Sequence, residues 1–298
     1  MTSVNSAMRW SAFLARHPMP FYAAHRGRQT DRNPENMAPE NTRPALRLAN
    51  ASKTPSEFDV LSTVDGHIIV HHDDETGRVF ELPGKQKRIS QITWNELRTA
   101  TLNALAYENK VSSITGMPYK IPEKLQTERI AELDEALDAS PDTPLFIELK
   151  PEKNTPENFE KHVYEIVQKK GALDRVVFLS FSRDSLKRLR KLDPNILLML
   201  NYSLPKPFHW LEKNPLWLRL YIPFIARQFD GLNPCYQTAS TDFVRLCHQY
   251  GLQTRPWVYH ETREEELNAF PRLKQLKVDG VITNAIDLAQ DYFDKKQG

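Results

Sequence analysis

Three acidic residues are spaced so that their side chains could share one cation. Glu57 and Asp59 are two residues apart in the short run 57–60, so their side chains would lie on the same face of an extended strand. Glu148 ends a second run of this kind at residues 145–148. Carboxylate oxygens prefer a hard ion, so these residues predict a site for Mg²⁺ or Ca²⁺ before zinc.

Two histidines and two cationic residues also follow short runs of strand type. They are His25, Arg26, His72 and Lys150. An imidazole can accept and donate a proton near neutral pH, so the histidine pair could act as general base and general acid. Arginine and lysine supply the fixed positive charge that suits nonbridging phosphate oxygens. The four residues therefore indicate phosphoryl chemistry, namely metal-dependent cleavage of a phosphodiester.

These residues need elements that bring them to one place. Short runs rich in β-branched and aromatic residues predict strands at 21–24, 57–60, 145–148, 176–180, 196–200, 229–232, 254–258 and 279–282. Helical periodicity predicts helices at 42–51, 130–139, 156–170, 183–191, 241–250 and 262–276. Another run, 67–70, predicts the second arm of a hairpin. In a barrel of βα units the carboxyl ends of all strands meet at one face, which would gather the polar residues.

The predicted fold class is therefore α/β, as a single (β/α)8 TIM-type barrel with an elaborated loop after strand 2. The barrel domain is expected at residues 21–298, after an N-terminal extension at 1–20. The elaborated loop is expected at 74–124, with a helix at 94–104. An open doubly wound sheet has the same periodicity, but no GxGxxG follows the first strand, so its dinucleotide-binding version lacks support.

The motifs also occur in the order of one known family, over residues 21–290. They are His25-Arg26-Gly27, Pro39-Glu40-Asn41-Thr42, Glu57-x-Asp59-Val60, Thr63-x-Asp65-Gly66, Val70-x-His72-Asp73, Ile147-Glu148-Leu149-Lys150, Ser180-Phe181-Ser182, Pro256-Trp257-Val258 and the closing stretch 278–284. In these motifs the chain resembles the glycerophosphodiester phosphodiesterases.

The resemblance implies a TIM-type barrel whose substrates are small-molecule glycerophosphodiesters. It implies that they are hydrolysed to glycerol 3-phosphate and an alcohol. It implies a divalent cation, Mg²⁺ or Ca²⁺, held by Glu57, Asp59 and Glu148. It implies that His25 and His72 form the catalytic pair. It further implies that Arg26 and Lys150 bind phosphate, that Trp257 walls the glycerol side, and that Glu40 and Asn41 support the metal and the first histidine.

Two of these positions are doubled in the sequence. Pro34-Glu35-Asn36 precedes Pro39-Glu40-Asn41, and only the later copy continues into Thr42, so Glu40 is preferred. His71 and His72 are adjacent, and neighbours on an extended segment face opposite sides, so one of them points away from the site. The spacing from the preceding Gly66 favours His72 as the residue that points into the site.

Two mechanisms fit the residues. In the first, the cation lowers the pKa of a bound water that attacks phosphorus. In the second, the 2-hydroxyl of glycerol attacks and makes a cyclic phosphate. Both need one histidine to take a proton and the other to protonate the leaving alkoxide. The sequence does not choose between them, although the family resemblance favours the second.

Residues 208–229 are rich in apolar and aromatic side chains and have few charges. The favoured interpretation is a crossover helix broken by Pro215 and Pro223 and packed on the barrel. The alternative is a segment that docks on a membrane surface. If it lies exposed near the catalytic mouth, the function becomes that of a lysophospholipase D type phosphodiesterase acting on lysophospholipids. A noncatalytic barrel that only binds phosphorylated ligands is disfavoured, because every expected catalytic position is filled.

Composition limits the remaining classes. With 40% hydrophobic and 26% charged residues, the chain has the composition of a soluble globular protein. The net charge of +2 and the lack of a basic stripe argue against a nucleic-acid partner. Cys235 and Cys247 have neither zinc-site nor disulfide spacing, which fits a reducing compartment. No signal peptide or spanning segment is expected, so the expected location is cytoplasmic, with peripheral membrane contact as the alternative. The oligomeric state is not indicated.

Overall fold

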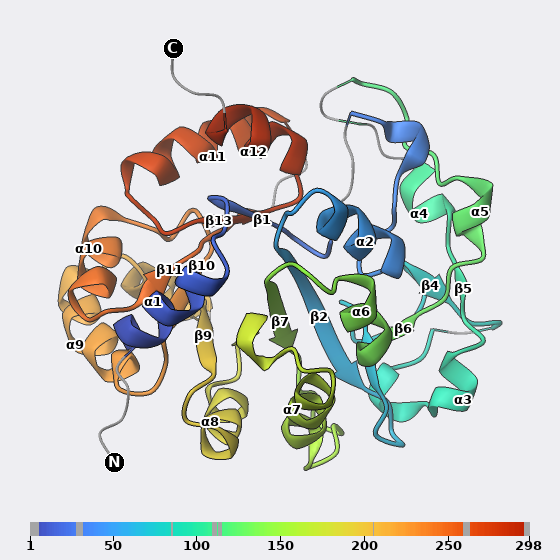
Figure 1. The fold of residues 1–298 in the computed structure, drawn as a ribbon, viewed down its shortest axis with the longest axis horizontal. Coiled ribbons are helices and arrows are strands. Elements are labelled where there is room, and N and C mark those ends of the chain that lie inside the picture. Colours follow the sequence, from blue (N-terminus) through green and yellow to red (C-terminus); the bar gives the residue numbers. More distant parts are fainter. Residues whose placement is uncertain are drawn as a thin grey trace.

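A parallel β-sheet forms the centre of the molecule (Figure 1). The structure is a computed structural model that describes residues 6–27, 32–84, 86–108, 112, 115–204, 206–258 and 263–294. In these residues the parallel strands are β1 (Tyr22–Ala24), β2 (Ser56–Ser62), β7 (Leu145–Leu149), β8 (Val176–Ser180), β9 (Leu197–Tyr202), β10 (Gly231–Pro234), β11 (Gln253–Thr254), β12 (Trp257–Val258) and β13 (Val281–Thr283).

The sheet closes on itself. Its strand order runs β11-β10-β9-β8-β7-β2-β1-β13-β12, so β11 and β12 are the two ends. Only Arg255 and Pro256 separate these ends in the chain, and a parallel bridge joins Cys235, after β10, to Trp257 in β12. One chain segment thus pairs with both edges, which gives a barrel of eight strand positions. The predicted TIM-type barrel is confirmed, and the open sheet is wrong.

The predicted strands are confirmed to within two residues at each end. The last-but-one strand, predicted as a continuous run at 254–258, is interrupted where Pro256 has no N–H to donate to a neighbouring strand. The hairpin arm predicted at 67–70 is β3 (Ile68–Val70), which pairs antiparallel with β2.

Helices surround the barrel, and Figure 1 shows them as a ring outside the strands. They are α2 (Arg43–Ala51), α6 (Leu133–Ala139), α7 (Phe159–Lys169), α8 (Arg183–Leu192), α9 (Pro215–Ala226), α10 (Thr241–Gln249), α11 (Arg263–Gln275) and α12 (Ile286–Phe293). Side-chain caps fix several starts; the Ser240 hydroxyl, for example, accepts a hydrogen bond from the N–H of Phe243. Each of the six helices predicted between the strands overlaps one of these. Residue 262, where the last was expected to begin, lies outside the described residues.

A helix that precedes the barrel covers one of its ends. In α1 (Ser6–Arg16), Trp10 and Phe13 belong to a cluster with the barrel side chains Phe146 and Met199. The indole N–H of Trp10 donates to the carbonyl of Asp230, 2.8 Å away, just before β10 begins. Helix α1 therefore plugs the amino-terminal end of the barrel, which leaves the carboxyl ends of the strands as the open face.

The segment after β3 forms a lobe beside the barrel, at the right of Figure 1. It contains β4 (Phe80–Glu81), β5 (Thr101–Leu102), α3 (Trp94–Leu97), α4 (Leu105–Glu108) and α5 (Glu123–Gln126), and β6 (Ala131–Glu132) returns the chain to β3. The lobe has its own apolar cluster, which includes Phe80 and Tyr107. The helix predicted at 94–104 is wrong beyond Leu97, because Thr101 and Leu102 pair with β4 instead and Leu102 becomes buried.

Of the two breaks predicted in the helix after β9, the one at Pro223 is wrong, whereas the helical segment is interrupted before Pro215, between Leu211 and Pro215. Pro215 begins α9, a position where the missing N–H costs nothing, and the helix continues through Pro223 to Ala226. Among the described residues, no helix has both the length and the apolar character needed to cross a bilayer.

Candidate active site

A cavity of about 700 Å³ opens at the carboxyl ends of the strands. Of the predicted site residues, nine line it: His25, Arg26, Glu40, Glu57, Asp59, His72, Glu148, Lys150 and Trp257. The tenth, Asn41, lies directly behind the cavity wall and is buried. The structure therefore brings together residues from strands far apart in sequence.

Three carboxylates converge on the cavity floor. Glu57 and Asp59 project from one face of β2, and Glu148 projects from the adjacent strand β7, where it is the register partner of Asp59. One oxygen from each lies within 4.8 Å of the others. A hard divalent cation takes oxygen ligands in such an arrangement, so this donor set fits Mg²⁺ or Ca²⁺.

The electrostatics of these carboxylates also fit a cation. Burial and the neighbouring charges of Asp59 and Glu148 raise the pKa of Glu57 well above its usual value. Burial and Asp59 likewise raise the pKa of Glu148 to about 8. Burial also opposes ionisation of Asp59, but nearby positive charges, chiefly Lys150, lower its pKa. In the absence of a cation, the cluster therefore favours a state with one ionised carboxylate. An added divalent charge would stabilise the ionised form of all three.

The first histidine follows β1 and has a defined orientation. His25 Nδ1 lies 2.8 Å from Oδ1 of Asn284, after β13, so Nδ1 carries the proton and Nε2 keeps a lone pair. Nε2 lies 3.9 Å from Oε2 of Glu57, beside the acidic cluster. Burial, with a contribution from the charge of Arg26, lowers the pKa of His25 to about 4. The ring is therefore neutral at neutral pH and presents an acceptor to the cavity.

A left-handed turn after β1 sets this arrangement. Arg26 and Gly27 have φ values of 58° and 81°, and the N–H of Arg26 donates to Oε2 of Glu57 at 3.1 Å. A Cβ on Gly27 would lie 2.9 Å from Cβ of Ala45 in α2, so only glycine fits there. The turn therefore carries His25 and Arg26 into the mouth of the barrel.

Asn41 connects this turn to the acidic cluster. Its amide Nδ2 donates to Oδ2 of Asp59 at 3.0 Å, and its backbone N–H donates to the carbonyl of Arg26 at 2.8 Å. Its φ of 55° is a left-handed conformation that asparagine tolerates better than most residues. Thr42 then caps α2, and its hydroxyl accepts from the N–H of Ala45. Asn41 thus holds Asp59 in place from behind.

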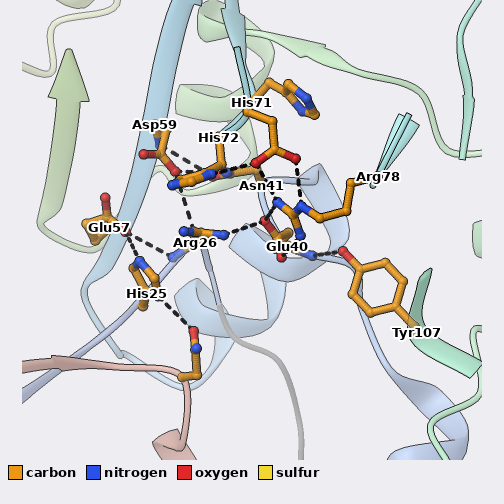
Figure 2. Close-up of polar contacts among 12 residues, drawn as sticks. His25, Arg26, Glu40, Asn41, Glu57, Asp59, His71, His72, Arg78 and Tyr107 are labelled. Atoms are coloured by element: carbon orange, nitrogen blue, oxygen red, sulfur yellow. Dashed lines mark hydrogen bonds and ion pairs between the residues drawn. The ribbon is translucent and has the colours of Figure 1, made fainter. Parts of the chain in front are cut away.

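The second histidine arrives on the segment after β3. His72 Nδ1 lies 2.7 Å from Oδ1 of Asp73, which orients the ring toward the cavity (Figure 2). The ammonium group of Lys150 donates to the carbonyl of His72 and lies 3.8 Å from Oδ1 of Asp59. Lys150 therefore connects the His72 backbone to the acidic cluster.

Arg78 links both halves of the site (Figure 2). Its Nε donates to Oδ2 of Asp73 at 2.6 Å, and its Nη1 donates to Oε2 of Glu40 at 2.9 Å. Glu40 in turn accepts from Nη1 of Arg26 at 2.8 Å. Burial alone would raise the pKa values of Glu40 and Asp73, but hydrogen bonds, those of Arg78 among them, hold both below their usual range. The chain Arg26–Glu40–Arg78–Asp73–His72 is therefore a continuous charged network.

The structure separates the doubled residues. Glu40 lines the cavity, whereas Glu35 is exposed on the 3-10 helix η1 (Pro34–Asn36). His72 lines the cavity, whereas His71 is buried behind it with its ring centroid 6.2 Å from that of Phe80. The geometry thus agrees with the choice of Glu40 and His72 as the residues that face the site.

Several residues of the cavity were not given roles from the sequence. Asn201 Nδ2 donates to Oε2 of Glu148 at 2.9 Å, and Asn233 Nδ2 donates to Oδ1 of Asn201 at 2.8 Å. Each directly follows a predicted strand, at 196–200 and 229–232, so position at a strand end could have identified both. Arg78 carries no such signal, because it lies within the lobe and reaches the site only through tertiary structure.

Comparisons with known proteins agree with this geometry. Residues 25–288 match the model of the glycerophosphoryl diester phosphodiesterase family. The chain is 26% identical to a glycerophosphodiester phosphodiesterase of Caldanaerobacter subterraneus subsp. tengcongensis, over 88% of this chain and 92% of the relative. It is 24% identical to a glycerophosphodiester phosphodiesterase of Bacillus subtilis, over 89% of this chain and 83% of the relative.

Solved structures show the same fold. A phosphodiesterase of Oleispira antarctica, solved in complex with the product sn-glycerol-3-phosphate, superposes with a TM-score of 0.71 at 22% identity, over 96% of this chain and 99% of that one. A putative glycerophosphoryl diester phosphodiesterase of Silicibacter pomeroyi superposes with a TM-score of 0.70 at 19% identity, over 94% of this chain and 96% of that one. Since the family model covers most of the sequence, this chain belongs to the glycerophosphoryl diester phosphodiesterase family and is a phosphoric diester hydrolase.

Proposed function

We propose that the chain hydrolyses small glycerophosphodiesters to glycerol 3-phosphate and an alcohol, with a divalent cation held by Glu57, Asp59 and Glu148. The observation that carries the proposal is the convergence of these carboxylates, within 4.8 Å of one another, with two oriented histidines at one cavity. When bound, the cation, Mg²⁺ or Ca²⁺, would offset negative charge on the phosphate.

The histidines have different surroundings, which supports different roles. His25 has its Nδ1 proton held by Asn284, so Nε2 is free to accept the proton of the attacking hydroxyl. His72 is paired through Nδ1 with the Asp73 carboxylate, which offsets positive charge on the ring. We assign His25 as the general base and His72 as the general acid. His72 then gives its proton to the leaving alkoxide oxygen as the P–O bond breaks.

The phosphate position is proposed from the cationic side chains. Arg26 and Lys150 line the cavity, and each lies within 4 Å of Asp59, at 3.7 and 3.8 Å. A nonbridging phosphate oxygen bound between them would sit beside the acidic cluster. Trp257 is half-buried and lines the same cavity, where its apolar ring would contact the glycerol carbons. In this proposal Glu40 and Asn41 position Arg26 and Asp59.

The test is an assay of purified protein with glycerophosphocholine and glycerophosphoethanolamine, with chelator and with Mg²⁺ or Ca²⁺ added back. His25→Ala and His72→Ala are each expected to lower turnover by about two to four powers of ten with the fold intact. His162→Ala, on α7 away from the cavity, serves as the matched control. Turnover close to wild type in both site variants would remove the histidines from the mechanism. Detection of a cyclic phosphate by ³¹P NMR would favour attack by the glycerol 2-hydroxyl over attack by water.

A second candidate is hydrolysis of lysophospholipids in the manner of a lysophospholipase D. The observation that favours it is Phe181, which lines the cavity and is also 51% exposed, so an acyl chain could leave the cavity along its ring. Cleavage of lysophosphatidylcholine in the same assay, at a rate comparable to glycerophosphocholine, would support it. Cleavage of the soluble diesters alone would eliminate it.

A further inference from the structure

Helix α9 exposes apolar side chains on its outward face, where a surface helix ordinarily carries polar ones. Leu216, Leu220 and Phe224 are spaced four residues apart, so they share one face of α9. The exposed fractions of these side chains are 71%, 75% and 46%. The 3-10 helix η4 (Lys206–Leu211) just before α9 adds Phe208 and Trp210, exposed by 51% and 67%. These five residues form the α9 apolar surface.

The α9 apolar surface is not explained by packing against the barrel. Leu218, Ile222 and Ile225 are the buried residues of the helix, and they fill the contact with the barrel. The outward face is therefore apolar as well, although an ordinary surface helix has a polar outward face. Exposed apolar residues that share one helix face, as Leu216, Leu220 and Phe224 do, mark an interaction surface.

This surface lies beside the mouth of the cavity. Phe181 follows β8, lines the cavity and is half-exposed. Arg183, two residues later, stacks its guanidinium over the ring of Phe224, 4.8 Å from the ring centroid. Arg183 thus connects the segment at the cavity rim to α9, so a partner bound to α9 would be next to the substrate entrance.

The exposed charged residues within the segment 207–229 are positive, and the acidic residues of the neighbouring helices α8 and α10, Asp184 and Asp242, are each paired with a basic residue. Lys213, Arg219 and Arg227 are exposed, and in the described part of the chain none of them takes part in an ion pair. Glu212 is the one acidic residue in the sequence 205–229, and it is buried, where it accepts hydrogen bonds from the N–H of Leu204 and the hydroxyl of Thr238. Exposed apolar residues flanked by basic ones fit an anionic lipid surface.

The same charges argue against a second copy of the chain as the occupant. A two-fold dimer formed through α9 would bring the basic residues of both copies into one interface. Lys213, Arg219 and Arg227 of each copy would then face like charges, which is unfavourable. We infer that the α9 apolar surface docks on an anionic lipid surface and so presents the mouth of the cavity to that surface. Lipid docking does not require the catalytic roles proposed above.

The test is co-sedimentation of the full chain with vesicles of phosphatidylcholine alone and of equal parts phosphatidylcholine and phosphatidylglycerol. Binding to the anionic vesicles is expected to be at least about tenfold stronger and to weaken with added salt, since each exposed basic residue near the surface contributes about fivefold. The double variant Leu216→Ser, Leu220→Ser is expected to lose at least about tenfold in affinity, because two exposed leucines no longer enter the lipid.

The matched control is the double variant Leu48→Ser, Leu105→Ser. Both leucines are exposed, on α2 and α4, which Figure 1 places on the opposite side of the barrel from α9. This variant is expected to bind vesicles like wild type. Brominated lipid should quench tryptophan fluorescence in wild type and less in Trp210→Phe. Circular dichroism and the melting temperature, Tm, confirm that each variant is folded.

Three outcomes would overturn the inference. The first is absence of binding to the anionic vesicles, and the second is equal loss of binding in both double variants. The third is a wild-type dimer that Leu216→Ser, Leu220→Ser converts to monomer, since a second copy would then cover the surface. Turnover of soluble glycerophosphocholine is measured separately, so failure of lipid docking and failure of the proposed hydrolysis are distinguishable.

Discussion

Arg78 offers the sharpest test of how the site is organised. Its guanidinium holds the carboxylates of Asp73 and Glu40 together, and Asp73 orients His72. Arg78→Met keeps the length of the side chain but removes every hydrogen bond and the charge. The Asp73 carboxylate is then free to rotate, and the His72 ring loses its fixed direction. Glu40 keeps its hydrogen bond from Arg26, so we expect turnover to fall by a larger factor than the binding of substrate.

The size of the effect follows from the contacts. Arg78 makes four hydrogen bonds to the two carboxylates, between 2.6 and 3.1 Å. A hydrogen bond to a charged group contributes about 1.5–3 kcal/mol, but the Arg78 side chain is 39% exposed, so solvent screens part of this. We expect a loss of about 2 kcal/mol in the free energy of unfolding. Loss of a partner that orients a catalytic residue typically costs about 10–100-fold, so kcat should fall by that factor.

The assay measures kcat and KM for glycerophosphocholine with excess divalent cation. The matched control is Arg88→Met, in the same lobe, where Arg88 is about half-exposed and pairs with Glu75 and Glu152 at 3.4 Å. Its kcat is expected to stay within about twofold of wild type, because surface ion pairs contribute little. Asp73→Asn should also lower kcat, and the variant with both changes should be no worse than the more damaging single one, since both act through His72.

Two results would refute this reasoning. If Arg78→Met and Arg88→Met have the same kcat, the guanidinium is not needed to orient His72. If the effects of Arg78→Met and Asp73→Asn add fully, the two residues act independently and the network has no role as a unit.

Other predictions follow from the same structure. The pKa values of Glu40 and Asp73 are lowered in the folded protein, so their ion pairs stabilise the fold above the ordinary carboxyl pKa of about 4. This stabilisation is lost as the pH falls. The difference in free energy of unfolding between wild type and Arg78→Met, measured in urea, should therefore become smaller below about pH 4. Mg²⁺ or Ca²⁺ should raise the Tm of wild type, and by less in Glu148→Gln; equal shifts would place the ion elsewhere. Asp230→Ala should lower the free energy of unfolding in urea by about 3–5 kcal/mol, because this buried carboxylate pairs with Arg9 and Arg190. A decrease below about 1 kcal/mol, the size expected for a surface ion pair, would contradict this.

The barrel could be predicted because its signals are local. Strands such as β7 and β8 are apolar runs that end in a turn, and α10 begins at a serine cap, so each element can be recognised from a few neighbouring residues. The error at residues 94–104 arose where a non-local contact decided the outcome. Pairing of Thr101 and Leu102 with β4 buried Leu102 and ended the helical segment at Leu97.

The sequence by itself determined which side chains would meet at the mouth of the barrel. His25, Glu57, Asp59 and Glu148 lie in or directly after parallel strands, whose carboxyl ends must converge on one face. That placement depends on strand position alone, so it could be read before any coordinates.

Only the tertiary structure decided how these side chains are held and what surrounds the entrance. Arg78 reaches Glu40 and Asp73 because the lobe folds back over the barrel. In the apolar helix α9, packing of one face on the barrel decides which apolar residues are left exposed. Both depend on contacts between segments distant in the chain. Such contacts are selected by the packing of the whole molecule and leave no periodic signal in the sequence.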